Sequence, residues 1–231
     1  MPMAPRRWIP LAVLAVVVVA CADSDDPADP AGEAVTPTSA QTGASTPVIN
    51  AAEDDPTHGC SGAYPSWESS PYVLPYPVGD AWPLGLDNCS SSFHGSNSPD
   101  SHAYDFDMDV GSEVVASRGG TVQFVYGDDP DGGGTPAGNL VVLDHGDGTV
   151  AVYLHFTADN IDVDIGDAVT QGQVIGRSGA SGTNAGYPHL HLIVVEAPGE
   201  YPYVGVPITF SNTTPNPRGL VSGETYLAMA P

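Results

Sequence analysis

Apolar and polar side chains alternate with a period of two from residue 103 onward, the pattern of β-strands that bury one face. AYDFDMDV puts Tyr104, Phe106, Met108 and Val110 on one face and three aspartates on the other. GSEVVASRGGTVQFVY indicates two strands around a glycine turn, and GDAVTQGQVIGRSG indicates a short strand pair. GNLVVLDHGDGTVAVYLHF indicates a hairpin with Asp147 and Gly148 in its tight turn. Because no helical period interrupts these segments, we predict an all-β fold of antiparallel sheets.

Composition limits both the size of the core and the kind of partner. The chain has 231 residues, of which 41% are hydrophobic, enough for one core with a small appendage. Its formal net charge is -23, and its five basic side chains are all arginines. Such an acidic body does not attract nucleic acid or an anionic membrane through its charge. We therefore predict that the chain has no nucleic-acid partner.

The first 58 residues indicate export rather than a folded domain. Residues 1–20 combine Arg6 and Arg7 with the short apolar run WIPLAVLAVVVVA, which is typical of a signal peptide. The run ends in VVAC, which resembles the lipobox of bacterial lipoproteins, so cleavage would leave a lipid-bearing Cys21. An ordinary secretory signal with an incidental cysteine is the alternative. Residues 21–58 are poor in large apolar side chains, which predicts a disordered tether to the membrane of the bacterial cell envelope.

Residues 59–93 are rich in proline and aromatic side chains, which favours an irregular wrap around the core. Two cysteines, Cys60 and Cys89, lie in this segment. In an exported protein an even pair of cysteines is typically a disulfide. We expect this disulfide to staple the start of the folded domain.

Histidines on two predicted strands are the candidate chemical groups. In YPHLHLIVVE, alternation puts His189 and His191 on the same face, about 7 Å apart. In AVYLHF the same rule groups His155 with Ala151 and Tyr153 on the polar side of its strand. Two histidines and one carboxylate make an open Zn²⁺ site with a position left for water. The spacing alone is equally compatible with a structural or solvated pair of histidines.

Four motifs occur in an order that adds to this interpretation. They are HAYDFDMDVGSEVVASRGGTV, GNLVVLDHGDGTVAVYLHF, DAVTQGQVIGRSGASG and PHLHL. Together they resemble the LytM/lysostaphin-type zinc endopeptidases of family M23, over residues 94–197. The resemblance implies a β-sandwich core that bears a groove. Residues 198–231 would be a C-terminal extension like that of some exported members.

The family's roles carry over to single positions of this chain. Asp105 and the second histidine of HLH, His191, match metal ligands. The first histidine, His189, and the histidine of YLHF, His155, match catalytic residues, the latter as a stabiliser of the oxyanion.

The remaining metal ligand is ambiguous, because the position four residues before Asp105 is Ser101. His94 and His102 are the two candidates. We favour His94, since the odd separation between His102 and Asp105 would point them to opposite faces of a strand.

The resemblance implies a Zn²⁺-dependent endopeptidase that hydrolyses peptide bonds in the stem or crossbridge of peptidoglycan. We also expect the chain to be a monomer. An alternative is a catalytically inactive M23-like scaffold of the cell wall, or an activator of other hydrolases. The retention of candidate ligands and catalytic histidines favours the enzyme.

Overall fold

The structure is a computed structural model that describes residues 59–90, 92–199 and 201–230. The predicted signal peptide, the lipidated Cys21 and the tether lie outside the described residues. Within the described part of the chain, no helix is long and apolar enough to cross a membrane.

The described residues form ten strands and one short 3-10 helix, η2 (Trp67–Ser69), so the prediction of an all-β fold is confirmed. The strands, in chain order, are β1 (Ala81–Leu86), β2 (Tyr104–Phe106), β3 (Glu113–Val115), β4 (Gly120–Tyr126), β5 (Asn139–Asp144), β6 (Thr149–Ile161), β7 (Ala168–Val169), β8 (Val174–Ser178), β9 (Leu190–Glu196) and β10 (Thr225–Leu227). The predicted hairpin is β5–β6, which pairs antiparallel from Asp144 opposite Val150.

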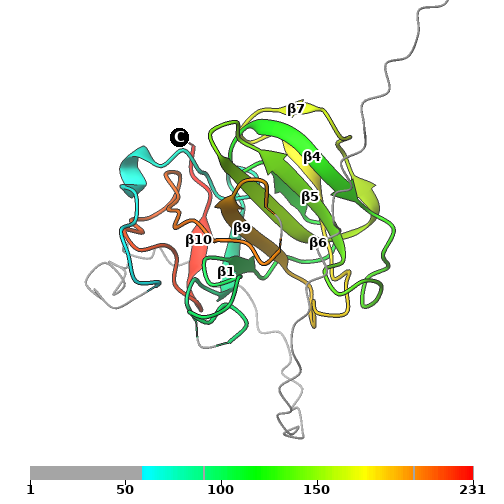
Figure 1. Ribbon diagram of the computed structural model, residues 1–231, viewed down its shortest axis with the longest axis horizontal. Coiled ribbons are helices and arrows are strands. Elements are labelled where there is room, and N and C mark those ends of the chain that lie inside the picture. Colours follow the sequence, from blue (N-terminus) through cyan, green and yellow to red (C-terminus); the bar gives the residue numbers. More distant parts are fainter. Residues whose placement is uncertain (1–58, 91, 200, 231) are drawn as a thin grey trace, which may run out of the picture.

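The strands pair antiparallel in the order β10-β1-β2-β9-β6-β5-β4-β7, while β8 pairs with both β3 and β6 (Figure 1). Val114 of β3 and Ile175 of β8 are buried in the same cluster as Val122, Val141 and Tyr153 of β4, β5 and β6. The β3–β8 arm therefore packs as a second layer on one face of the long sheet. The predicted pairing of β7 with β8 is wrong, because β7 pairs with β4 and β8 crosses to the second layer.

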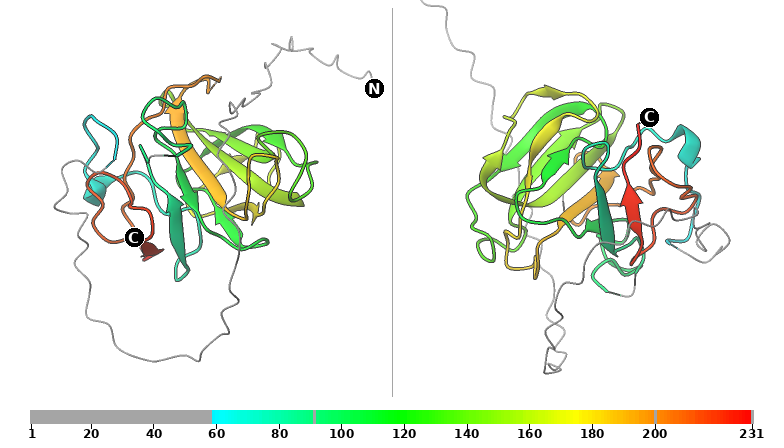
Figure 2. Two further views of the ribbon diagram at one scale, coloured as in Figure 1. Left: turned by 90° about the horizontal axis from the view of Figure 1, so that it is seen from below. Right: turned by 180° about the vertical axis from the view of Figure 1, so that it is seen from behind.

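The N-terminal wrap and the C-terminal segment cover the same end of the molecule, as Figure 2 shows in cyan and in orange to red. Both contribute a strand, since β1 pairs with β10 on one side and with β2 on the other. Their buried side chains join the main core cluster; these are Tyr72, Leu74, Tyr76, Ile208, Phe210, Leu220, Tyr226 and Ala228. A disulfide joins Cys60 to Cys89 across the wrap.

The two faces of β9 meet different surroundings. Leu190, Leu192 and Val194 are buried in the main cluster, while Ile193 and Val195 belong to a smaller cluster on the opposite face. By alternation, His191 shares the face of the smaller cluster. The main core therefore anchors the sheet on one side and leaves the other side for chemistry.

Candidate active site

A cavity of about 540 Å³ opens on the histidine-bearing face of the sheet. Its lining includes five of the predicted site residues, namely His94, Asp105, His155, His189 and His191. The rest of the lining is largely uncharged and includes Leu86, Phe93, Pro136, Ala137, Leu154 and Ala185. The five predicted site residues come from four separate stretches of the chain and meet in this one cavity.

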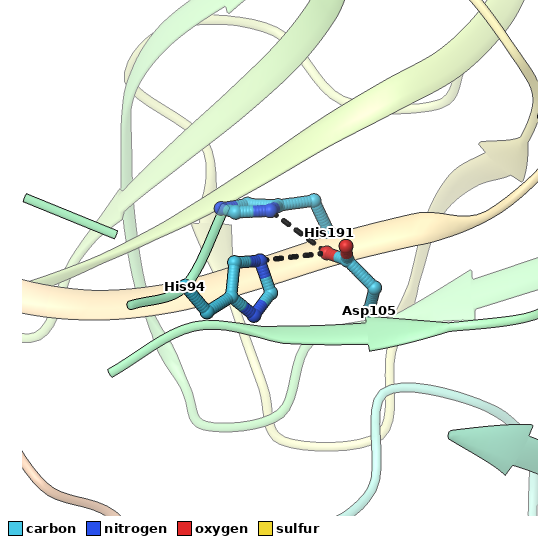
Figure 3. A group of neighbouring side chains, drawn as sticks. All are labelled: His94, Asp105 and His191. Carbon is cyan, nitrogen blue, oxygen red and sulfur yellow. Dashed lines mark hydrogen bonds and ion pairs between the residues drawn. The ribbon is translucent and has the colours of Figure 1, made fainter. Parts of the chain in front are cut away.

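His94, Asp105 and His191 line this cavity and point toward one another (Figure 3). The Asp105 Oδ1 atom lies 2.9 Å from His191 Nδ1 and 3.3 Å from His94 Nε2. All three residues are buried, and one ligand atom from each lies within 4.8 Å of the others. The pairing of β2 with β9 explains the first contact, because it sets Asp105 directly opposite His191.

His94, rather than His102, reaches this group. His94 lies in the connection between β1 and β2, and it is 1% exposed. The Nδ1 atom of His102 lies 3.2 Å from Ser101 Oγ, and its ring packs against the backbone of Gly205. His102 is not part of the cavity lining. The structure thus favours the same histidine as the sequence analysis, but not through parity, because β2 begins at Tyr104, after His102.

Three of the four histidines in the cavity are held by backbone carbonyls through Nδ1. His155 Nδ1 lies 2.8 Å from the Ser181 oxygen, His189 Nδ1 lies 2.9 Å from the Tyr187 oxygen, and His94 Nδ1 lies 3.2 Å from the Asp87 oxygen. A carbonyl can only accept, so Nδ1 carries the proton in each ring and Nε2 keeps its lone pair. His191 is the exception, since its Nδ1 faces the Asp105 carboxylate.

His155 enters the cavity through a break in β6, not through alternation. Leu154 is paired with His191 and lies on the cavity side, so regular alternation would turn His155 away. Instead, His155 has φ 72° and the register with β5 shifts at this point, which marks a β-bulge. The predicted grouping of His155 with Ala151 and Tyr153 is wrong, because those two side chains are buried in the main core.

The bulge brings the imidazoles together. The ring centre of His155 lies 4.6 Å from that of His189 and 6.2 Å from that of His191. Burial, together with the electrostatic effect of His189 and His191, lowers the pKa of His155 to about 3. Burial also lowers the pKa of His189, against the opposing effect of Asp105. Both rings are therefore neutral near pH 7 and can accept hydrogen bonds or protons at Nε2.

Asp105 is a carboxylate despite its burial. Burial by itself would raise its pKa, but the hydrogen bonds and charges of His191 and His94 hold the pKa well below the usual range. A buried carboxylate between two imidazoles is a donor set of the type that binds Zn²⁺.

Tyr187 is a neighbour of the site that the sequence reasoning did not single out. Its ring lies 4.6 Å from the His189 ring at an angle of 30°, so it covers one face of that imidazole. Its hydroxyl interacts with the Asp107 carboxylate, and a Cβ on Gly85 would lie 2.7 Å from that hydroxyl. The only signal in the sequence is the position of Tyr187 two residues before His189 in YPHLHL.

Comparisons with known proteins relate part of the chain to one family of peptidases. Residues 100–201 match the profile of peptidase family M23. The chain is 37% identical over 91 residues to the peptidoglycan DD-endopeptidase ShyA of Vibrio cholerae, covering 39% of this chain and 19% of that protein. It is 31% identical over 118 residues to the cell division protein DipM of Caulobacter vibrioides, covering 51% of this chain and 18% of that protein.

Among solved structures, lysostaphin from Staphylococcus simulans is 27% identical, with a TM-score of 0.39, over 50% of this chain and 42% of that one. Within this all-β fold, residues 100–201 are a domain that matches peptidase family M23. The chain spans about a fifth of the length of the curated relatives it matches. His94 precedes the matched residues.

Proposed function

We propose that this chain is a zinc-dependent endopeptidase that hydrolyses peptide bonds in the stem or crossbridge of bacterial peptidoglycan. The observation that carries the proposal is the convergence of His94, Asp105 and His191 beside two neutral histidines in one cavity. The match of residues 100–201 to peptidase family M23 supports peptide hydrolysis, and the resemblance to a peptidoglycan endopeptidase supports the substrate class.

The three residues fit a zinc ion by the chemistry and spacing of their donors. Two imidazole nitrogens and one carboxylate oxygen within 4.8 Å of one another can be bridged by bonds of about 2 Å. A site with three protein ligands keeps one position for water or substrate. Bound there, Zn²⁺ would polarise the scissile carbonyl and lower the pKa of a water molecule toward about 7.

We assign the proton transfers to His189. Its Nε2 atom lies 3.8 Å from Asp105 Oδ2, so the carboxylate stabilises the imidazolium that forms when Nε2 takes a proton from water. The same Nε2–H can then protonate the leaving amine. The Tyr187 ring and the Tyr187 carbonyl hold the imidazole in this orientation.

His155 has a different environment. Its Nδ1–H donates to the Ser181 carbonyl, and no carboxylate among the described residues lies within ion-pair distance of it. Its Nε2 lone pair therefore accepts a hydrogen bond, which orients the attacking water. Stabilising an oxyanion, as the family resemblance implies, requires that Nε2 first gain a proton.

The direct test is cleavage of purified peptidoglycan by the purified full-length chain. Soluble peptide fragments should appear with zinc, disappear after chelation and return when zinc is added back. Stoichiometric zinc binding without any cleavage would contradict the enzyme and favour the non-catalytic scaffold or activator.

We also propose that the chain is exported and anchored to the cell envelope through lipid on Cys21, which precedes the described residues. The lipobox-like VVAC carries this proposal. Replacing Cys21 with serine should abolish labelling by a radioactive fatty acid and release the protein from the membrane fraction. Unchanged membrane association of Cys21→Ser would contradict the anchor.

A further inference from the structure

One ring nitrogen in the site lacks the support that its neighbours have. His191 Nε2 is buried and has no hydrogen-bond partner among the described residues. The other three histidines each donate Nδ1–H to a carbonyl. If His191 binds a metal through Nδ1, the atom that faces Asp105, the proton must sit on Nε2. A buried N–H without an acceptor is costly, so the bound state needs an acceptor beside it.

The Asp100 carboxylate is placed to be that acceptor. Its Oδ1 atom lies 3.8 Å from His191 Nε2, and the Asp100 side chain is 14% exposed. The remaining gap is about 1 Å beyond a normal hydrogen bond, a distance that small side-chain rotations can close. Asp100 lies on the opposite side of the His191 ring from Asp105, because the two carboxylates face different nitrogens.

Tyr203 holds Asp100 in this position. The Tyr203 hydroxyl donates to Asp100 Oδ1 at 2.7 Å. Tyr203 is 7% exposed and packs in the smaller core cluster, so this packing fixes the position of its hydroxyl. Tyr203 follows the residues that match the M23 profile, which end at 201. The C-terminal segment of this chain thus reaches back to the site.

We infer that Asp100 is a positioning residue that accepts a hydrogen bond from His191 Nε2 and, oriented by Tyr203, strengthens metal binding by His191. This inference rests on the zinc site of the proposed function. A carboxylate behind a ligating histidine fixes its tautomer and orientation and raises its basicity. Loss of such a partner typically weakens metal affinity about 10–100-fold.

The test measures zinc affinity of the full-length chain by competition with a chromophoric chelator, without substrate. We expect Asp100→Ala to weaken zinc binding about 10–100-fold. Asp100→Asn keeps a neutral acceptor oxygen and should retain part of the affinity. Tyr203→Phe keeps the packed ring, loses only the hydroxyl, and should weaken zinc binding less than Asp100→Ala.

Tyr126→Phe is the matched control, because Tyr126 also donates to an aspartate, Asp129, at 3.0 Å but does not line the cavity. It should bind zinc like the wild type. Circular dichroism of each metal-free variant shows whether it remains folded. If Asp100→Ala is unfolded, the comparison of Tyr203→Phe with Tyr126→Phe decides.

Two outcomes would overturn the inference, and they are distinguishable. Wild-type zinc affinity in Asp100→Ala and Tyr203→Phe would overturn the inference. A raised KM for peptidoglycan fragments in the same variants would then identify Asp100 as a substrate contact. A wild-type chain that binds no zinc would overturn the proposed function, and the inference with it.

Discussion

Strands β9 and β6 lie side by side and supply histidines to the same cavity by opposite means. His191 lies within the regular ladder of β9, and His189 precedes that strand by one residue. His155 lies in the middle of β6, at a bulge with positive φ. The comparison teaches that residue parity predicts side-chain direction on a regular strand and mispredicts it where the strand is broken.

The break in β6 coincides with a change of partner. Up to Leu154 the strand pairs with β9, whereas Phe156 and beyond pair with β8 of the second layer. The Phe156 carbonyl at the bend accepts hydrogen bonds from the side chains of Asn139 and Ser181. The backbone of the bend is therefore satisfied by neighbours that are distant in sequence.

The largest expected difference concerns metal binding by β9. His191→Ala removes one of three proposed ligands, so zinc affinity should fall by more than the 10–100-fold typical of supporting partners. Metal analysis after dialysis measures the loss. His102→Ala is the control, since its ring lies outside the cavity, and it should retain zinc. Loss of zinc from His102→Ala with retention in His94→Ala would reverse the ligand assignment.

The second prediction is that His155 and His189 contribute equally to catalysis. His155→Ala and His189→Ala should each retain zinc and lower kcat about 10²–10⁴-fold. Each substitution removes one imidazole Nε2 atom from the cavity and leaves all three proposed zinc ligands in the chain. Peptidoglycan digestion at matched zinc occupancy measures the effect. If His155→Ala cleaves as fast as the wild type, the bulge has no catalytic purpose.

The third prediction uses the pKa of His155, which burial lowers to about 3. Between pH about 3 and pH about 6.5, residue 155 is protonated in the unfolded chain and neutral in the native protein. The free energy of unfolding should therefore fall as pH decreases through this window, by up to about 1.4 kcal/mol per pH unit.

In His155→Gln that contribution disappears, and the pH dependence should flatten. Urea unfolding of the metal-free proteins from neutral to mildly acidic pH measures both slopes. Some slope should remain, because burial also lowers the pKa of His145 and His189. Parallel curves for the wild type and His155→Gln would contradict the low pKa of His155.

The smallest expected effect tests the backbone of the two strands directly. At position 155 glycine relieves a positive φ, so His155→Gly should be more stable than His155→Ala by about 1 kcal/mol. At position 189, which is not among the described residues with positive φ, glycine should be less stable than alanine by about 0.5–1 kcal/mol. Urea unfolding of the four variants measures this reversal. The same order at both positions would rule out a strained bulge.

The alternation of residues in the sequence predicted the direction of the histidine side chains at β9 but not that of His155 in β6. Alternation put His189 and His191 on one face of β9 and Asp105 on the polar face of β2, and the structure has them so. The same rule failed for His155, because AVYLHF carries no glycine or proline that would reveal a bulge. The sequence did not predict the support of His191 by Asp100 and Tyr203 either. The Tyr203 hydroxyl donates to an Asp100 carboxylate that lies 103 positions earlier in the chain.

By itself the sequence determined the all-β class and the faces of the regular strands, because both follow from the local geometry of an extended backbone. Only the tertiary structure decided that His94 meets Asp105, that His155 turns inward and that the C-terminal segment reaches Asp100. These contacts join segments that are distant in the chain, and the packing of layers and loops sets their distances. No local pattern of residues encodes them.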